Sequence, residues 1–265
     1  MPAVAACWLL LSASVAAGPT SAPAATQRVT FDTIDGVHIV GDYYAPPPSA
    51  PGEKSPCAIL IHMYPATRAS WAGLAPQLRD AGFAVLAYDI RGAGESTEPA
   101  DKHLREDYAR RATPLFERGF EDVAGAVRFL AARPECDARR LVLVGASVGC
   151  SIAIHYSMKS PDVRGLICLS PGTNYMGLKT PTHLRLSKCH SITLIAPAGE
   201  REPCEELSRV RPGVTVTLRP GGSELHGTRL LESSFGPELS RSIVEIARGS
   251  VQPRPQLFRP RSRPK

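Results

Sequence analysis

The segment from Leu141 to Gly149 constrains the fold of this chain more than any other. Its first four residues are all apolar, which is typical of a strand buried in a parallel sheet. Residues 145–149 (Gly-Ala-Ser-Val-Gly) follow directly, and a helix-like run begins at Val148. Glycines on both sides of Ser147 remove the Cβ atoms that would collide in so sharp a turn. The spacing therefore predicts a serine hydroxyl exposed at the tip of a strand.

The rest of the chain alternates between strand-like and helix-like patterns. Helical spacing is expected after Ser70, which can cap a helix, along one long helix from Phe116 to Leu130, and from Pro237 to Gly249. This alternation predicts an α/β fold with a mostly parallel central sheet of about eight strands and helices on both faces. The further apolar runs that support it lie at 58–61, 83–88, 166–169, 192–195 and 214–218.

The domain is expected to begin with a hairpin. Residues 28–32 alternate polar and apolar side chains, Asp35 and Gly36 can form a tight turn, and 37–40 resume a strand pattern. We therefore predict two antiparallel strands at the start of a single domain over residues 26–249.

The first 25 residues differ in kind from that domain. Ala3 to Ala17 is apolar and uncharged, and small residues follow up to Ala25. The stretch is too short for a membrane span and resembles a signal peptide, although it lacks the usual positive charge. Export to the periplasm or the medium is expected. A lipoprotein anchor at Cys7 is disfavoured, because the apolar segment follows that cysteine instead of preceding it.

The net charge of +6 is concentrated at one end of the chain. Residues 251–265 hold five basic side chains, no acidic one and several prolines. Residues 250–265 are therefore expected to form a disordered, solvated tail, and no nucleic-acid partner is expected.

Six cysteines remain once Cys7 is removed with the leader. Most are expected as small buried core residues, and none has a spacing typical of a metal site. Cys57 and Cys136, each just before a predicted strand, are the pair best suited to a disulfide.

A serine hydroxyl needs a base, usually histidine, and the histidine needs a carboxylate that orients it and stabilises its charged form. His226 is the best candidate base, because it lies in a glycine-rich loop a few residues after the last predicted strand. His155 suits a packed helix position. The remaining candidates are expected at the surface: His38, His103, His183 and His190.

The order Ser147, an acid, then His226, together with the loop Asp-x-Arg-Gly-x-Gly-x-Ser at 89–96, resembles the α/β-hydrolase superfamily over residues 28–249. The short chain is most similar to the dienelactone-hydrolase-type branch. Many relatives insert a helical lid where this chain has only the short stretch from Pro171 to Ser191, so the resemblance implies no large lid and an open site.

The resemblance places the acid after the strand 192–195, where the usual aspartate is missing and two glutamates compete. Glu202 fits the family position better, because a helix is expected to begin near Pro203; Glu200 is the alternative. Either could instead be a solvated acid favoured by the helix dipole.

The resemblance also assigns an oxyanion hole, whose N–H groups stabilise the negative oxygen of the tetrahedral intermediate. Val148 is expected to supply one N–H group and Tyr64 the other. Met63 stands where relatives often have glycine, so its side chain could narrow the acyl pocket or shift this loop.

These features predict a serine hydrolase that cleaves small-molecule carboxylic esters, or else thioesters or amides, through an acyl-serine intermediate, with no metal or organic cofactor. An open site favours short acyl groups. The alternative is a catalytically inactive binding or scaffold protein with a hydrolase fold. Epoxide and haloalkane chemistry is disfavoured, because relatives with those activities have aspartate where this chain has Ser147.

Overall fold

The computed structural model describes residues 26–252 of the 265-residue chain. The expected signal peptide and residues 253–265 of the expected tail lie outside the described residues. Within them, no helix is long and apolar enough to cross a membrane.

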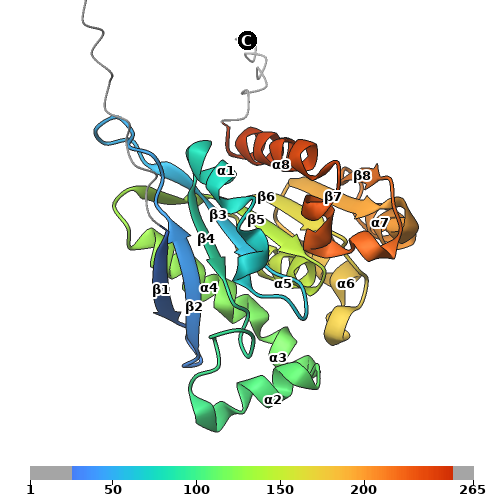
Figure 1. Cartoon of the computed structure of the whole chain (residues 1–265), viewed down its shortest axis with the longest axis horizontal. Coiled ribbons are helices and arrows are strands. Elements are labelled where there is room, and N and C mark those ends of the chain that lie inside the picture. The colour runs from blue at the N-terminus through green and yellow to red at the C-terminus, as the bar shows by residue number, and fades with distance from the viewer. Residues whose placement is uncertain (1–25, 253–265) are drawn as a thin grey trace, which may run out of the picture.

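The predicted central sheet is confirmed. It has eight strands in the order β1-β2-β4-β3-β5-β6-β7-β8 (Figure 1). The N-terminal pair is antiparallel as predicted, β2 is also antiparallel to β4, and the remaining neighbours are parallel. The strands are β1 (Gln27–Asp32), β2 (His38–Tyr44), β3 (Ser55–Ile61), β4 (Ala84–Tyr88), β5 (Cys136–Ala146), β6 (Val163–Leu169), β7 (Ser191–Pro197) and β8 (Thr215–Arg219).

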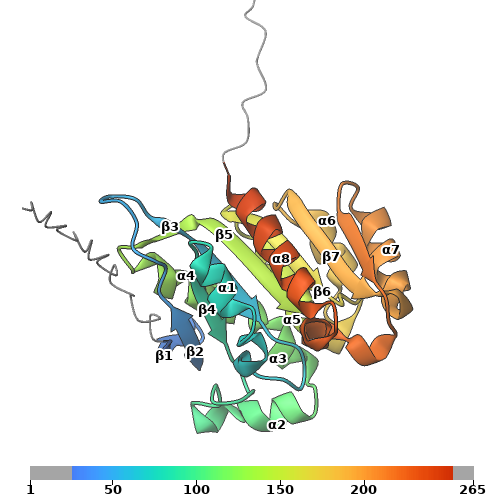
Figure 2. The ribbon, with the colours of Figure 1, turned by 45° about the horizontal axis from the view of Figure 1, so that its top comes forward.

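Helices cover both faces of the sheet, because the central strands bury side chains in both directions. In β3, Ile59 and Ile61 pack in one core cluster, whereas Ala58 and Leu60 pack in the other. The second cluster lies under α1 (Ala75–Asp80) and α8 (Gly236–Val251), which Figure 2 shows together on one face. The first lies under α4 (Gly119–Ala131), α5 (Val148–Ser157), α6 (Thr180–Leu186) and α7 (Arg201–Val210).

Two helix predictions need correction. The single long helix expected from Phe116 to Leu130 is two helices, α3 (Thr113–Glu117) and α4. Gly119 at the start of α4 packs so close to α5 that a Cβ atom there would lie 2.9 Å from the Ile152 side chain. The helix expected after Ser70 is a 3-10 turn, η1 (Arg68–Trp71), followed by α1; the Ser70 hydroxyl donates to the Thr67 carbonyl and caps no helix.

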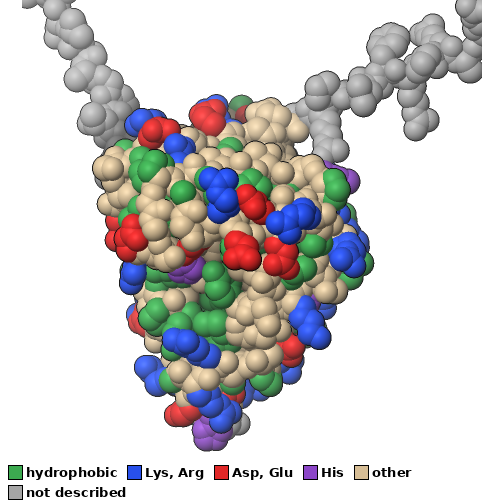
Figure 3. All heavy atoms as spheres, turned by 90° about the vertical axis from the view of Figure 1, so that its right-hand side faces the viewer, with side chains coloured by type: hydrophobic (Ala, Val, Ile, Leu, Met, Phe, Trp, Pro, Cys, Tyr) green, Lys and Arg blue, Asp and Glu red, His purple; other side chains and the backbone are tan. Residues whose placement is uncertain are grey.

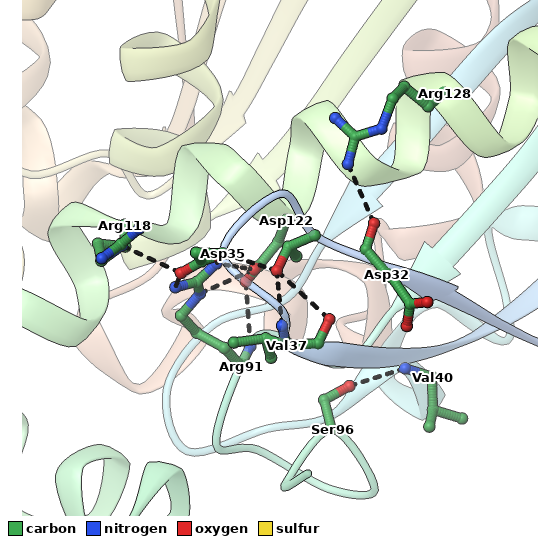
Figure 4. Close-up of polar contacts among 10 residues, drawn as sticks. Asp32, Asp35, Val37, Val40, Arg91, Ser96, Arg118, Asp122 and Arg128 are labelled. Atoms are coloured by element: carbon green, nitrogen blue, oxygen red, sulfur yellow. Dashed lines mark hydrogen bonds and ion pairs between the residues drawn. The ribbon is translucent and has the colours of Figure 1, made fainter. Parts of the chain in front are cut away.

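The loop after β4 is a structural junction. Arg91, 2% exposed, forms ion pairs with Asp122 of α4 at 2.8 Å and with Asp35 of the β1–β2 turn at 2.7 Å (Figure 4). Ser96 in the same loop accepts a hydrogen bond from the Val40 N–H at 2.9 Å. Burial raises the pKa of Asp35, but hydrogen bonds from Arg91 and Thr33 and the nearby arginine charges outweigh that effect and lower it to about 2. The motif at 89–96 thus ties the hairpin to the parallel sheet.

The six cysteines among the described residues are all buried free thiols. Cys57 and Cys136, the pair best suited to a disulfide, form no bridge. The described residues also contain no cluster of three or more histidine, cysteine or acidic side chains suited to a metal ion.

Candidate active site

Ser147 occupies the sharp turn that its sequence predicts. Its backbone is left-handed, with φ 53° and ψ −119°, between the end of β5 and the start of α5. The flanking glycines are required by close contacts: a Cβ on Gly145 would lie 2.5 Å from the Gly149 carbonyl oxygen, and a Cβ on Gly149 would lie 2.2 Å from that of Ile61. This strained turn places Ser147 at the carboxyl end of the sheet. Ser147 is only 5% exposed, however, so the structure does not show the exposed hydroxyl and open site that the sequence predicted.

His226 forms its hydrogen bond with Glu200. It forms none with Glu202, the glutamate preferred from the sequence. The His226 Nδ1–H group donates to Glu200 Oε1 at 2.7 Å, and the side chains are 25% and 14% exposed. With Nδ1 protonated, Nε2 is left as the basic nitrogen.

Two features of the β7–α7 connection explain why Glu200, and not Glu202, reaches His226. Helix α7 begins at Arg201, two residues before the expected start, so Glu202 lies in its first turn as an exposed side chain. Glu200 is instead the last residue of the short turn η4 (Ala198–Glu200). The Gly199 N–H donates to the Gly221 carbonyl at 3.0 Å, which holds this turn against the loop that carries His226.

The loops that carry His226 and Ser147 also meet. The residue after the histidine, Gly227, donates its N–H to Ser170 Oγ at 2.9 Å. A Cβ on Gly227 would lie 3.6 Å from Cβ of Ala146, the residue before the nucleophile. The serine loop and the Glu200–His226 pair therefore share one corner of the sheet.

The two N–H groups expected to form the oxyanion hole lie at the same corner. Val148 begins α5, and Tyr64 lies just beyond β3, whose last residue contacts Gly149. Among the residues that the structure describes, neither N–H group has a hydrogen-bond acceptor. The start of α5 also carries the positive end of the helix dipole, so this corner suits a developing negative charge. The Met63 side chain is buried, and its sulfur packs against Gly227.

His62 holds this loop in place, a role that the sequence did not suggest. It is fully buried, and the Ile90 N–H donates to its Nε2 at 2.9 Å. Its Nδ1–H therefore donates to the Met63 carbonyl at 2.8 Å. Burial lowers the pKa of His62, so the neutral ring links the loop after β3 to the loop after β4.

Aromatic side chains pack together beside the N–H groups expected to form the oxyanion hole. The Tyr64 ring packs on Tyr108 with centroids 4.9 Å apart and on Phe116 at 6.5 Å, while the Arg111 guanidinium lies 4.7 Å from the Tyr64 centroid. Tyr108 belongs to α2 (Leu104–Ala109), which with α3 projects beyond the carboxyl ends of β3 and β4 (Figures 1 and 2). A small helical cap thus comes from the β4–α4 connection. The stretch between Pro171 and Ser191 contains only a short 3-10 turn and α6 and forms no large lid, as predicted.

The remaining histidines take no part in this site. His155 is packed as predicted, but His183, expected at the surface, is half-buried and stacks on it with centroids 4.1 Å apart. Burial and the neighbouring His183 lower the pKa of His155 to about 4. His38, His103 and His190 are exposed, as predicted.

Comparison with known proteins agrees with this architecture. The profile of the alpha/beta hydrolase fold family matches residues 59–209. A thiohydrolase, apmlB, of Arthrinium phaeospermum is 26% identical over 152 residues, which cover 55% of this chain and 43% of the relative. Epoxide hydrolase B of Mycobacterium tuberculosis is 27% identical over 182 residues, which cover 67% of this chain and 41% of the relative. The chain therefore spans about two fifths of the length of these relatives.

Solved structures of similar shape cover nearly the whole described domain. A dienelactone hydrolase from Anabaena variabilis superposes with a TM-score of 0.66 at 17% identity, covering 86% of this chain and 99% of that one. An esterase from Pyrococcus furiosus gives a TM-score of 0.64 at 17% identity, covering 86% of this chain and 92% of the esterase. At such identities the likeness shows the fold alone.

Proposed function

Because the chain belongs to the alpha/beta hydrolase fold family, we propose that it is a serine hydrolase that cleaves carboxylic esters through an acyl-serine intermediate. The observation that carries the proposal is the 2.7 Å hydrogen bond between Glu200 and His226 beside the strained turn of Ser147. A serine, a histidine with one nitrogen held by a carboxylate, and two free N–H groups at one corner of the sheet are the parts that acyl transfer needs.

Acylation follows from these positions. Ser147 Oγ attacks the ester carbonyl and passes its proton to His226 Nε2, while the carbonyl electron pair moves onto oxygen. The Val148 and Tyr64 N–H groups stabilise that oxyanion. Collapse restores the carbonyl, breaks the bond to the leaving alcohol, and transfers the proton from Nε2 to the alcohol oxygen. Glu200 stabilises the imidazolium that exists between the two proton transfers.

Deacylation repeats these steps with water in place of the serine. His226 Nε2 takes a proton from water, and the resulting hydroxide attacks the acyl-serine carbonyl. The tetrahedral intermediate then collapses: the bond to Ser147 Oγ breaks, the carboxylic acid is released, and His226 Nε2 returns its proton to Ser147 Oγ. No step requires a group other than the residues named.

Thioesters are a second candidate substrate class, favoured by the match to a protein named a thiohydrolase. The attacked carbonyl is the same and only the leaving atom differs, so the same residues would serve. Epoxide opening is disfavoured despite the match to an epoxide hydrolase, because the nucleophile position holds Ser147 and no carboxylate.

A fluorophosphonate probe tests the proposal directly, because it phosphonylates only an activated serine. We expect the full-length protein to be labelled at Ser147 and the Ser147→Ala variant to remain unlabelled. Both should show the same melting temperature within a few degrees, which would establish that the variant is folded. Absence of labelling on the folded wild-type protein would favour the alternative, an inactive binding or scaffold protein.

We propose further that the enzyme acts after export, on the basis of the apolar first 25 residues. Fractionation of producing cells should then find the mature chain outside the cytoplasm, with its new N-terminus between residues 18 and 26. A cytoplasmic protein that retains Met1 would refute this.

A further inference from the structure

Tyr175 packs against the base and lies beside the turn that carries the nucleophile. Its ring lies perpendicular to the His226 imidazole, with centroids 5.9 Å apart and an interplanar angle of 83°. Its hydroxyl donates a long hydrogen bond, 3.4 Å, to the Ser170 carbonyl, and the residue before Ser170, Leu169, accepts a hydrogen bond from the Ser147 N–H at 2.9 Å, so the hydroxyl lies next to the nucleophile turn. Neither the acyl-transfer steps above nor the family motifs assign this residue a role.

The local backbone holds the Tyr175 ring at this place. The residue begins the short turn η3 (Tyr175–Gly177), in which Met176 and Gly177 are left-handed, with φ 50° and 84°. The ring covers Gly172 so closely that a Cβ there would lie 2.4 Å from a ring carbon. Gly177 in turn packs against Thr113 of α3, where a Cβ would lie 2.4 Å from the threonine methyl carbon.

The reaction geometry indicates what lies beside Tyr175 during catalysis. His226 Nε2 must protonate the leaving-group oxygen, so that oxygen has to lie between the histidine and Ser147 when the bond breaks. The Tyr175 side chain lies at this place, with its ring on His226 and its hydroxyl on the carbonyl of Ser170 beside the nucleophile turn. Burial raises the pKa of the Tyr175 phenol, so the hydroxyl stays protonated at neutral pH and can donate.

We propose that Tyr175 is a catalytic residue whose hydroxyl donates a hydrogen bond to the leaving-group oxygen as the ester bond breaks. The proposal rests on the proposed acyl-serine mechanism. As the tetrahedral intermediate collapses, the oxyanion electron pair re-forms the carbonyl, the bond to the leaving oxygen breaks, and that oxygen receives its proton from His226. Tyr175 keeps its own proton. Its hydroxyl turns away from the long bond to Ser170, which is a weak bond to give up.

The proposal predicts a dependence on the leaving group. An alkoxide is a poor leaving group and gains much from a hydrogen bond, whereas p-nitrophenolate leaves readily without one. Tyr175→Phe keeps the ring against His226 and removes only the hydroxyl. We expect kcat/KM for ethyl acetate to fall about tenfold, the effect of one hydrogen bond to an oxygen that gains charge, and kcat/KM for p-nitrophenyl acetate to change by less than about twofold.

Tyr88→Phe is the matched control. The Tyr88 hydroxyl lies in the core with no hydrogen-bond partner in the described part of the chain, so its removal should affect neither ester. An equal loss on both esters in Tyr175→Phe, or a greater loss on the p-nitrophenyl ester, would overturn the role of Tyr175 and leave the proposed function intact. A wild-type protein that hydrolyses neither ester and takes no fluorophosphonate would overturn the proposed function and this role with it.

Discussion

Replacing Glu200 by glutamine tests the assignment of the acid most directly. Glutamine has nearly the same shape, and its amide oxygen can still accept the bond from His226 Nδ1, so the change removes the negative charge and little else. At an effective dielectric constant of about 20, a unit charge a few ångströms from the imidazolium is worth about 4 kcal/mol. If that stabilisation is lost only when the imidazolium forms, kcat should fall about a thousandfold.

The assay is steady-state hydrolysis of p-nitrophenyl acetate by the wild-type, Glu200→Gln and Glu202→Gln proteins, with thermal unfolding of each. Glu202 provides the matched control, because it is exposed in the first turn of α7 and only two residues away. We expect kcat of Glu202→Gln to remain within about twofold of wild type, since the loss of one exposed charge near a helix start is a small effect.

The outcome that refutes this reasoning is equally definite. If Glu202→Gln lost most activity while Glu200→Gln remained active, the hydrogen bond between Glu200 and His226 would not be the catalytic one. If both variants were fully active, His226 would work without either carboxylate, and the proposed mechanism would have to be abandoned.

Three further predictions concern the junction after β4 and the shape of the site. Arg91→Met should destabilise the fold by about 3–5 kcal/mol, because it leaves the fully buried Asp122 carboxylate without its partner. Calorimetry should show a melting temperature lower by roughly 10 °C. A double variant with Asp122→Leu that regained none of the lost stability would contradict this cause. The lowered pKa of Asp35, about 2, means that its ionised form stabilises the fold above about pH 4, and that this contribution is lost as the pH falls towards 2. The free energy of unfolding of wild type should therefore exceed that of Asp35→Asn by about 2 kcal/mol more at pH 5 than at pH 2, and an unchanged difference in urea titrations would exclude the effect. Among p-nitrophenyl esters, kcat/KM should fall from acetate to palmitate, because Ser147 is only 5% exposed and a long acyl chain has little room to reach it; a preference for palmitate would contradict this.

One face of the molecule carries an apolar area. On the side of the molecule that carries α6 and α7, hydrophobic side chains gather between acidic side chains above and Lys and Arg below (Figure 3). An apolar area of this sort favours apolar over charged groups, because burying a charge without a partner costs free energy.

The sequence by itself determined the features that depend on neighbouring residues. Alternating side chains indicated the hairpin, continuous apolar runs indicated the two-sided sheet, and the glycines around Ser147 indicated the sharp turn. These patterns are reliable because a strand in the middle of a parallel sheet must be apolar on both faces. In addition, the turn at Ser147 admits only glycine two positions before and two positions after the serine. His226 could be chosen for a similar local reason, since its glycine-rich loop offers no core position.

The tertiary structure alone decided which side chains meet across the sheet. Glu200 reaches His226 because α7 starts at Arg201 and because the turn at Gly199 is bonded to the loop at Gly221, which comes from the next strand. The break before Gly119 depends likewise on the approach of α5, and the position of Tyr175 depends on η3 folding against α3. Each of these contacts joins segments far apart in the chain, and residue spacing carries no information about distances across a sheet.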